Sequence, residues 1–520
     1  MTSMMDLAKG YKIHIILFVT AVVIYLSTSC SLHDWDDYQY FFGAKSILQN
    51  YTYLVDGNPS QYPMGYSLLI VPFFCFLGIN AQSAVYPCAI LGAFTVVLLY
   101  EFVKDLFDTR GALFASLFLI FGIWSYSTVI MSEVPALFFF LLGIFAVVKY
   151  ANTEKAVFIY LFYFAAGFAC LIRYTSGLMF VIMGLYIILS NKLYLLKRKE
   201  VWIGTFIFLL ILSPQLIYNH IHFGSIFRTG YGGLLISETV ERMVCNHRLH
   251  NTIRYIQYLV FGFGSPLLPF YLYGMWDLIK RRNREILSLI IPWITLPLLF
   301  FSYCYYPRYI NSVLPALLIL SGLGFSKMCD KLVIEAKNNR VKPDKSPFIQ
   351  FKTIKIVLII LLVVILLVPT AMNSFNNIQE REARIECQKE TFTWIRKNCG
   401  DGDIILSHPE PSYEYYSHRK VHSLRTSHNE LKNLISTHNT SYLVINNVWR
   451  NRAVYAVYSD TEQWLKETYG LTHLKTFECK PKYPLISQLK HDFKRKAGIS
   501  AFPPTPVTDR WDIYLIAKAS

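Results

Sequence analysis

Apolar runs of roughly 15 to 20 residues, separated by short polar links, recur along the first 370 residues of this 520-residue chain. An α-helix of about 20 apolar residues crosses the hydrocarbon core of a bilayer. Hydrophobic residues make up 54% of the chain and charged residues 16%, which is more apolar surface than one soluble core of this length needs. The sequence therefore predicts a polytopic α-helical membrane protein with about 11 transmembrane helices.

The predicted spans differ in character. The run at 13–26 is consistent with a signal peptide or a first transmembrane helix, and we expect a retained helix because the next loop needs an anchor. The run at 64–78 is short and contains Pro72, so we expect it to lie in the outer interface. The other predicted crossings are 83–103, 112–130, 134–148, 157–171, 177–189, 201–217, 266–279, 286–301, 309–325 and 356–368.

Lysine and arginine gather in every second connection between these runs, after residues 103, 148, 189, 279 and 326. The net charge is +16, but the basic residues form short separate groups, so we expect a lipid bilayer and no nucleic acid as partner. Because Lys and Arg in short loops resist translocation, these connections and the N-terminus are predicted to be cytoplasmic. The protein is then a multi-pass cell-membrane protein whose other loops and C-terminal region are extracytoplasmic.

The chain becomes polar, with mixed charge, after residue 370. Short β-branched or alternating runs there are separated by helical patterns, which is typical of an α/β domain. We therefore predict a transmembrane domain over residues 1–370, whose outer loop 31–66 carries an acidic motif, and a small extracytoplasmic α/β domain over residues 371–520. The predicted strands include 403–406, 442–445 and 511–516, and the predicted helices include 388–397 and 461–469.

Isolated charges at the outer ends of apolar helices are the best candidates for chemistry, because such groups are costly unless they pair or bind a ligand. Each of them alone is equally well explained as a solvated loop charge or a helix-end anchor. The topology brings them to one level of the membrane, and we predict that they share a site. They are Asp36, Asp37, Glu133, Arg173 and Arg308.

The same positions carry a family resemblance. Residues 36–40, Asp-Asp-Tyr-Gln-Tyr, resemble the Asp-Glu-x-x-Tyr signature of the first outer loop of GT-C glycosyltransferases of the protein O-mannosyltransferase and aminoarabinose transferase type. Residues 61–69 resemble the Pro-rich segment that follows it in that superfamily. Met131–Pro135 looks like its second acidic position, Leu171–Thr175 like its Leu-Thr-Arg-Pro segment, and Tyr306–Tyr309 like its late Arg-Tyr segment. The order and spacing of all five agree.

Some residues depart from the family pattern. Asp37 stands where Glu is more usual, and Tyr174 stands where Pro follows the arginine. The core of the Pro-rich segment is reduced to Pro63-Met64-Gly65. The sequence is thus closer to the broad bacterial family 39-type branch than to true protein mannosyltransferases, so the identity of the acceptor is not carried over.

The resemblance implies a GT-C fold and the transfer of one sugar from a polyprenyl-phosphate carrier to a cell-envelope acceptor at the outer membrane face. The acceptor is a glycolipid, a glycan or a protein. A lipid phosphate leaves without a proton but needs its charge stabilised, which suits the guanidinium fork of Arg173 and Arg308, with Arg228 behind them.

The attacking acceptor must lose a proton, and we assign Asp36 as the general base of an inverting displacement. Asp37 or Glu133 would orient the acceptor or hold the loop, and Tyr40 and Tyr62 would stack on the sugar or the carrier. Tyrosines at the outer interface are also common as simple belt anchors.

No cofactor is expected. Asp34 and Asp36 superficially form the Asp-x-Asp of metal-dependent nucleotide-sugar transferases, so a divalent metal is an alternative, but a nucleotide donor would be on the other side of the membrane. The scattered histidines lack ligand spacing. Cys387 and Cys399 are either buried thiols or, in an oxidising compartment, a disulfide.

Two other function classes remain open. A transporter or flippase of a lipid-linked sugar would place its ionisable groups near the bilayer midplane. A membrane glycoside hydrolase would use a carboxylate pair such as Asp36 with Glu133.

Overall fold

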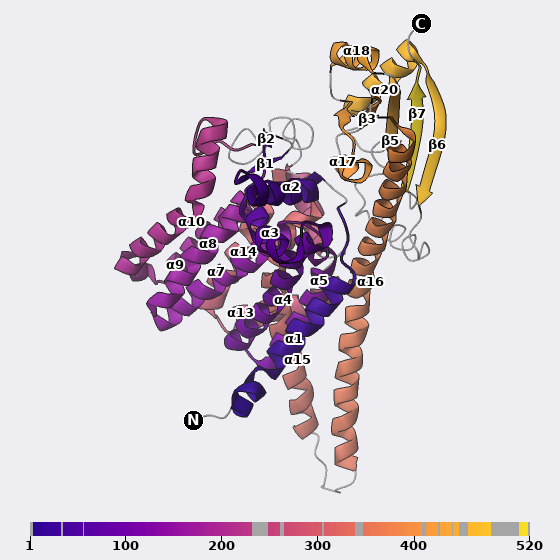
Figure 1. Cartoon of the computed structure of the whole chain (residues 1–520). Coiled ribbons are helices and arrows are strands. Elements are labelled where there is room, and N and C mark those ends of the chain that lie inside the picture. Colours follow the sequence, from indigo (N-terminus) through magenta and orange to yellow (C-terminus); the bar gives the residue numbers. More distant parts are fainter. Residues whose placement is uncertain are drawn as a thin grey trace. The chain divides into compact units, whose positions relative to one another are not determined.

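The computed structural model is mostly helical and divides into two compact units (Figure 1). The transmembrane unit comprises Met1–Ser29 and Tyr40–Ser374, and the C-terminal unit comprises Cys30–Gln39 and Phe375–Ser520. The acidic loop 31–66 was predicted to lie wholly in the transmembrane domain, whereas the structure groups its residues 31–39 with the C-terminal unit. The structure describes residues 4–32, 35–55, 57–230, 248–259, 265–303, 306–338, 347–400, 402–407, 412–424, 427–438, 440–446, 456–479 and 509–517.

The first half of the transmembrane unit contains a short hairpin, β1 (Leu54–Val55) and β2 (Asn58–Pro59), among its helices. The acidic loop is not an irregular segment, since it includes a helix of four turns, α2. The helices are α1 (Met4–Ser27), α2 (Trp35–Asn50), α3 (Gly65–Leu77), α4 (Ala81–Leu106), α5 (Thr109–Gly122), α6 (Trp124–Ser127), α7 (Glu133–Thr153) and α8 (Ala156–Ile172).

The second half of this unit contains α-helices linked by short 3-10 turns. Its last helix, α16 (Pro347–Asn398), continues into the C-terminal unit. The other elements are η1 (Tyr174–Gly177), α9 (Leu178–Leu189), η2 (Leu193–Lys197), α10 (Lys199–Phe223), α12 (Arg248–Gln257), η4 (Ser265–Leu267), α13 (Leu268–Lys280), α14 (Arg284–Phe300), η5 (Phe301–Tyr303), η6 (Pro307–Val313) and α15 (Leu314–Asn338).

Among the described residues, five helical segments are long and apolar enough to cross a membrane. Each matches a predicted crossing to within one residue at its start or includes it whole. Other apolar helices, including the 13-residue α3 with its internal Pro72, are shorter. The prediction of about 11 crossings therefore stays a prediction. The five segments are Ala81–Leu106, Glu133–Thr153, Lys199–Phe223, Arg308–Lys331 and Val357–Asn398.

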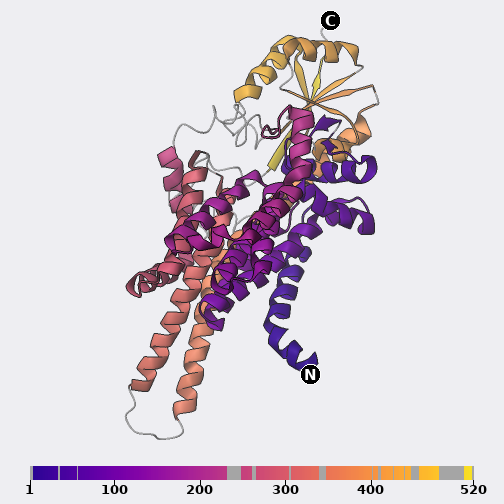
Figure 2. The ribbon, with the colours of Figure 1, turned by 90° about the vertical axis from the view of Figure 1, so that its left-hand side faces the viewer.

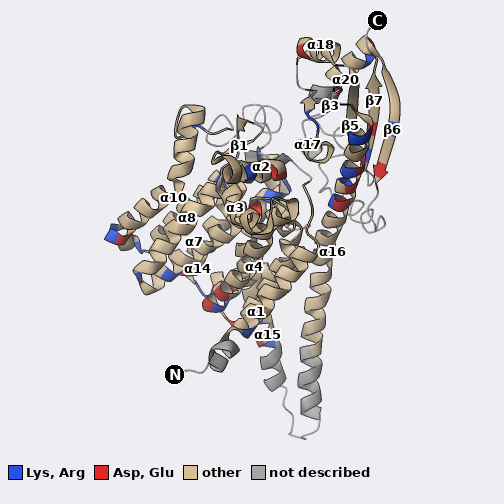
Figure 3. Cartoon of the chain, in the orientation of Figure 1, with Lys and Arg blue, Asp and Glu red and all other residues tan. Residues whose placement is uncertain are grey.

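Long stretches of these helices carry no charged residue, and the charges lie near the helix ends except in α16, whose C-terminal half carries charges along its length (Figure 3). Ion pairs join the basic connections to one another. Lys149 Nζ lies 2.6 Å from Asp105, and Arg110 Nη2 lies 2.6 Å from Asp330. The basic connections after α4, α7 and α15 thus meet at one end of the transmembrane unit, as expected if they lie on one side of a membrane.

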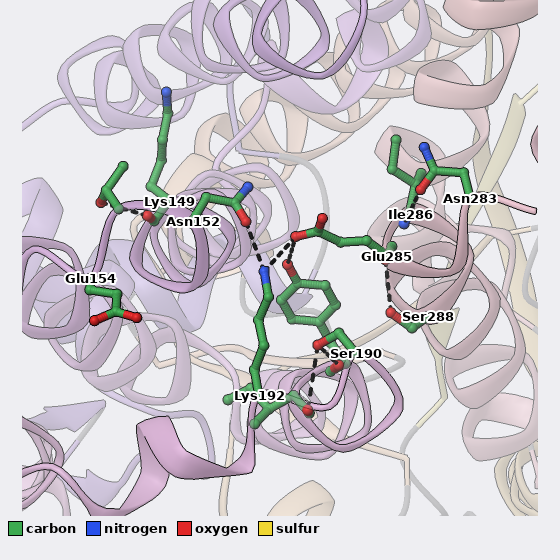
Figure 4. A network of polar contacts seen from close by, with 12 residues as sticks. Lys149, Asn152, Glu154, Ser190, Lys192, Asn283, Glu285, Ile286 and Ser288 are labelled. Atoms are coloured by element: carbon green, nitrogen blue, oxygen red, sulfur yellow. Dashed lines mark hydrogen bonds and ion pairs between the residues drawn. The ribbon is translucent and has the colours of Figure 1, made fainter.

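Lys192 extends this network to two more helices (Figure 4). Its Nζ atom lies 2.7 Å from Glu285 Oε1 and 2.9 Å from Asn152 Oδ1, and the Tyr186 hydroxyl also donates to Glu285. Residues at the ends of α7 and α14 therefore supply the ion-pair and hydrogen-bond partners of this lysine. We interpret this cluster as a structural clamp between helix ends rather than a ligand site.

The C-terminal unit is a three-layer α/β domain, and Figure 2 shows its sheet nearly edge-on. The strand order is β4-β3-β5-β7-β6, with β4, β3 and β5 parallel and β7 antiparallel to both neighbours. The strands include the three predicted ones. They are β3 (Ile404–Ser407), β4 (Val421–Ser423), β5 (Ser441–Asn446), β6 (Leu471–Cys479) and β7 (Asp509–Ile516).

Successive side chains of a strand point to opposite faces of the sheet, so the strands contribute to two hydrophobic cores, one on each face. Ile404 and Leu406 face α18 (His428–Thr437) and α20 (Ala456–Tyr469), while Ile405 faces the end of α16 and α17 (Ser412–Ser417). Cys387 and Cys399 are buried in the second core as thiols.

Candidate functional site

A cavity of about 470 Å³, which includes space open to solvent, lies in the transmembrane unit at the ends of helices opposite to the basic connections. Three charged side chains line it, and all three are among the site residues predicted from the sequence. The full lining is Glu133, Ala136, Leu137, Phe140, Arg173, Thr175, Ser176, Leu178, Phe301, Arg308, Tyr309, Asn311 and Ser312.

Glu133 is the first residue of α7, and its side chain is only 4% exposed. The N-terminus of a helix favours a carboxylate through its free N–H groups and its dipole. Pro135 fits in the first turn, where a helix does not need its missing N–H. Because Lys149 lies near the other end of the 21-residue α7, the cavity and the basic cluster are separated by about 24 Å along the helix.

Arg173 lies at a break between two helices. α8 ends at Ile172, and Arg173 takes an extended conformation before η1 begins. A Cβ on Gly65 would lie only 2.5 Å from the Leu171 carbonyl carbon, so only glycine lets α3 approach this backbone so closely. Met64 N–H donates to Gln215 Oε1 at 2.8 Å and fixes the same turn. The Pro-rich motif therefore supports the backbone that presents Arg173.

Arg308 lies in η6, directly after Pro307. Trp293 Nε1 donates to the Ser312 carbonyl at 2.8 Å, which holds the far end of η6. The Tyr255 hydroxyl donates to the Tyr306 carbonyl at 3.2 Å, which holds its near end. The 3-10 turn is thus fixed on both sides of the arginine.

The two arginines share one carboxylate oxygen. Arg173 Nη1 lies 2.7 Å and Arg308 Nε 3.4 Å from Glu133 Oε1. Arg173 also donates to Ser132 Oγ at 3.3 Å. Burial alone would lower the pKa of Arg173, but the Glu133 carboxylate raises it above its ordinary value, so this arginine is always charged. Among the described residues that line the cavity, two guanidinium groups thus face one carboxylate.

Tyr309 lies beside both arginines, with its ring centroid 5.5 Å from Arg173 Cζ and 5.9 Å from Arg308 Cζ. Together with Ser132 and Asn311 it belongs to the site, yet the sequence analysis did not assign it. Tyr309 could have been found as the residue after the arginine in the late motif. Ser132 could likewise have been found as the residue before the glutamate in the second acidic motif, whereas Asn311 carries no such signal.

Tyr40 and Tyr62 belong to an aromatic group that also contains Tyr66. The centroids of the first two rings are 5.4 Å apart, and the Tyr40 and Tyr66 centroids are 5.1 Å apart. Tyr40 also interacts electrostatically with Arg173. The exposed Arg228, in the turn after α10, does not line the cavity.

Asp36 and Asp37 lie in the first turn of α2, within the part of that helix that belongs to the C-terminal unit. Asp37 is fully buried and Asp36 is half-buried. Asp34, the partner in the Asp-x-Asp pattern, lies outside the described residues. Among the residues that the structure describes, no group of three His, Cys, Asp or Glu side chains could hold a metal ion.

Comparisons with known proteins give one family match and several matches of fold. Residues 61–218, which include Glu133 and Arg173, match the family model described as dolichyl-phosphate-mannose-protein mannosyltransferase. No curated protein matches the chain.

Two solved structures share the fold. ArnT from Cupriavidus metallidurans in the apo state is 15% identical, with a TM-score of 0.63 over 90% of this chain and 96% of that one. The archaeal oligosaccharyltransferase AglB from Archaeoglobus fulgidus, in complex with an inhibitory peptide and a dolichol-phosphate, is 13% identical, with a TM-score of 0.58 over 90% of this chain and 73% of that one.

The chain is thus similar to GT-C glycosyltransferases in part of its sequence, and it has the fold of ArnT and AglB. The resemblance found in the sequence motifs is thereby confirmed.

Proposed function

We propose that this protein transfers one sugar from a polyprenyl-phosphate carrier to a cell-envelope acceptor, a glycolipid, glycan or protein, at the outer face of the membrane. The observation that carries the proposal is the pair of arginines in the cavity, where Arg173 and Arg308 lie beside the same carboxylate oxygen of Glu133. Two guanidinium groups held at one place suit the charge of a leaving phosphate. Guanidinium groups bind phosphate through paired hydrogen bonds, which are stronger than neutral ones.

The arginines would act on the leaving group. As the bond between the anomeric carbon and the phosphate oxygen breaks, negative charge grows on that oxygen, and positive groups already in place lower the barrier. Glu133 is then a positioning residue that holds both guanidinium groups. Structures of the fold relatives support this choice of carrier: ArnT was solved bound to undecaprenyl phosphate and AglB with a dolichol-phosphate.

Asp36 is our candidate for the base that takes the proton of the acceptor hydroxyl or amine, which gives inversion by direct displacement. It precedes Tyr40 by one turn of α2, so the two side chains share a face of that helix. Tyr40 in turn interacts with Arg173. Asp37 is buried, which suits a structural role in holding the segment that carries Asp36. Arg228 is exposed and does not line the cavity, so it has no part in this proposal.

The deciding experiment is mass spectrometry of lipid-linked sugars and of cell-envelope glycans in cells that express the wild type, Asp36→Asn or no protein. We expect Asp36→Asn to accumulate one polyprenyl-phosphate sugar and to lose one glycan modification, as the cells without the protein do. Profiles of folded Asp36→Asn that equal the wild type would remove Asp36 as the base. Sugar released to water would support a hydrolase, and movement of the lipid-linked sugar without transfer would support a flippase.

No metal takes part in this proposal, because the arginines supply the positive charge. We expect purified protein to keep its rate of transfer after dialysis against EDTA. A rate that falls and returns on addition of Mg²⁺ or Mn²⁺ would contradict this part.

A further inference from the structure

A hydrogen bond joins the C-terminal domain to the segment that precedes the acidic motif. The hydroxyl of Tyr416, in α17, donates to the Leu32 carbonyl at 2.7 Å and lies 3.2 Å from Ser31 Oγ. Leu32 is fully buried, and these partners are 384 and 385 positions apart in the chain. All of them belong to the C-terminal unit.

Neighbouring side chains pack on the Tyr416 ring and hold its hydroxyl in place for this hydrogen bond. Its ring packs edge-to-face on Tyr415, with centroids 5.2 Å apart, and Lys389 of α16 lies 5.8 Å from the ring centroid. Burial raises the pKa of Tyr416 above its ordinary value, although the hydrogen bond with Ser31 opposes the rise, so the hydroxyl remains a donor at neutral pH.

A second contact holds the same segment one residue earlier. The buried thiol of Cys30 interacts with Arg381 of α16 and lies in the field of Glu382 and Asp37. The segment is therefore fixed by both α16 and α17. Asp36 follows Leu32 by four positions, so the chain allows it to lie at most about 14 Å from the fixed backbone.

We propose that Tyr416 is a positioning residue, which anchors the segment that carries Asp36 and Asp37 to the C-terminal domain and so makes that domain part of the transfer machinery. Tyr416 acts through the backbone of Leu32 and does not touch the substrate. The kinetic consequence rests on the proposed function, while the anchor itself does not.

The test compares Tyr416→Phe with a matched control, Tyr442→Phe, in the full-length protein. Tyr442 lies in the same domain, and its hydroxyl also donates to a backbone carbonyl, that of Asn398. Both variants lose one hydroxyl and keep the ring. Hydrogen–deuterium exchange of the peptide that covers residues 30–39 reports the anchor, and transfer kinetics with a polyprenyl-phosphate sugar report its effect on the reaction.

We expect at least a threefold faster exchange of residues 30–39 in Tyr416→Phe and no change in Tyr442→Phe. In transfer, kcat of Tyr416→Phe falls about 10-fold while KM for the lipid donor stays within twofold, because the donor-binding arginines are untouched. If Tyr416→Phe folds poorly, Ser31→Ala gives the same exchange test from the other side of the contact.

Unchanged exchange in Tyr416→Phe overturns the anchor. Faster exchange with wild-type kcat overturns the positioning role. If the wild type itself transfers no sugar, the proposed function fails, and the exchange result alone then decides whether the domain holds the segment.

Discussion

One carboxylate oxygen, Glu133 Oε1, lies 2.7 Å from Arg173 Nη1 and forms the closest ion pair of the cavity. The glutamate is almost fully buried, whereas 21% of the arginine side chain is exposed. The arginine thus presents part of its guanidinium to the cavity while the glutamate is turned inward. Arg173 is therefore the residue that can bind a ligand, and Glu133 is the residue that holds the arginine in place. Substituting each residue separately tests these two roles.

Replacing Glu133 by Gln keeps the shape of the side chain and removes its charge. Arg173 and Arg308 then lie close together without the carboxylate between them, and loss of one partner of a buried ion pair costs about 3 kcal/mol. We expect a lower melting temperature in detergent and at least a 10-fold loss of transfer. The control is Glu478→Gln in β6, outside the transmembrane unit. A Glu133→Gln variant with wild-type melting and turnover would contradict the role of this carboxylate.

Arg173→Lys and Arg308→Lys test the phosphate contact. Lysine keeps the positive charge but loses the planar fork that pairs with a phosphate. We expect KM for the lipid donor to rise about 10-fold in each variant, which corresponds to about 1.4 kcal/mol. Arg228→Lys is the matched control, since Arg228 is exposed and does not line the cavity. If Arg228→Lys weakens donor binding as much as the other two, the cavity is not where the phosphate binds.

The charged residues of the cavity were predictable because each interrupts or borders an apolar run. An ionisable group there is costly unless it pairs with another charge or binds a ligand. Glu133 and Arg308 stand out in this way. Tyr309 and Asn311 do not, because a tyrosine or an asparagine at a helix end packs or caps as often as it binds. Tyr309 and Asn311 reach the site because residues 307–313 form the 3-10 helix η6, and the local sequence does not predict that helix.

The fold was predictable where periodicity is strong, as in α7 and in the strands of the C-terminal domain. α2 was missed because its sequence is polar and aromatic and lacks an apolar stripe. The grouping of residues 30–39 with the C-terminal unit was also missed. It depends on contacts such as that of Tyr416 with Leu32, and contacts over such a separation leave no local pattern.

Gly65→Ala tests the support of Arg173 by the Pro-rich motif. A new Cβ would lie 2.5 Å from the backbone of Leu171, so α3 or the end of α8 must shift. We expect a loss of about 2 kcal/mol in stability and reduced transfer. Gly184→Ala is the control, because nothing lies within 4 Å of its Cβ position, and alanine favours its helix. Equal melting temperatures for the two variants would refute the close approach.

The acid stability of the transmembrane unit should depend on Asp108, which caps α5. Its carboxylate accepts a hydrogen bond from Gly111 N–H at 2.8 Å and another from the Ser326 hydroxyl of α15. Burial by itself would raise the pKa of Asp108, but these hydrogen bonds and the nearby Arg110 hold it below its ordinary value of 3.8. The folded state therefore binds the proton less readily than the unfolded state does.

A lowered pKa stabilises the fold above the unfolded pKa, and the stabilisation is lost as the pH falls through the folded pKa. We expect the wild type to melt above Asp108→Asn at pH 6 by an amount that corresponds to about 1 kcal/mol. The difference should hold down to about pH 5 and shrink below about pH 4, because protonation makes the wild type resemble the amide. Melting curves from pH 7 to pH 3 measure it. A difference that stays constant over this range would show that the charge of Asp108 contributes nothing, and one that grows towards low pH would reverse the sign of its pKa shift.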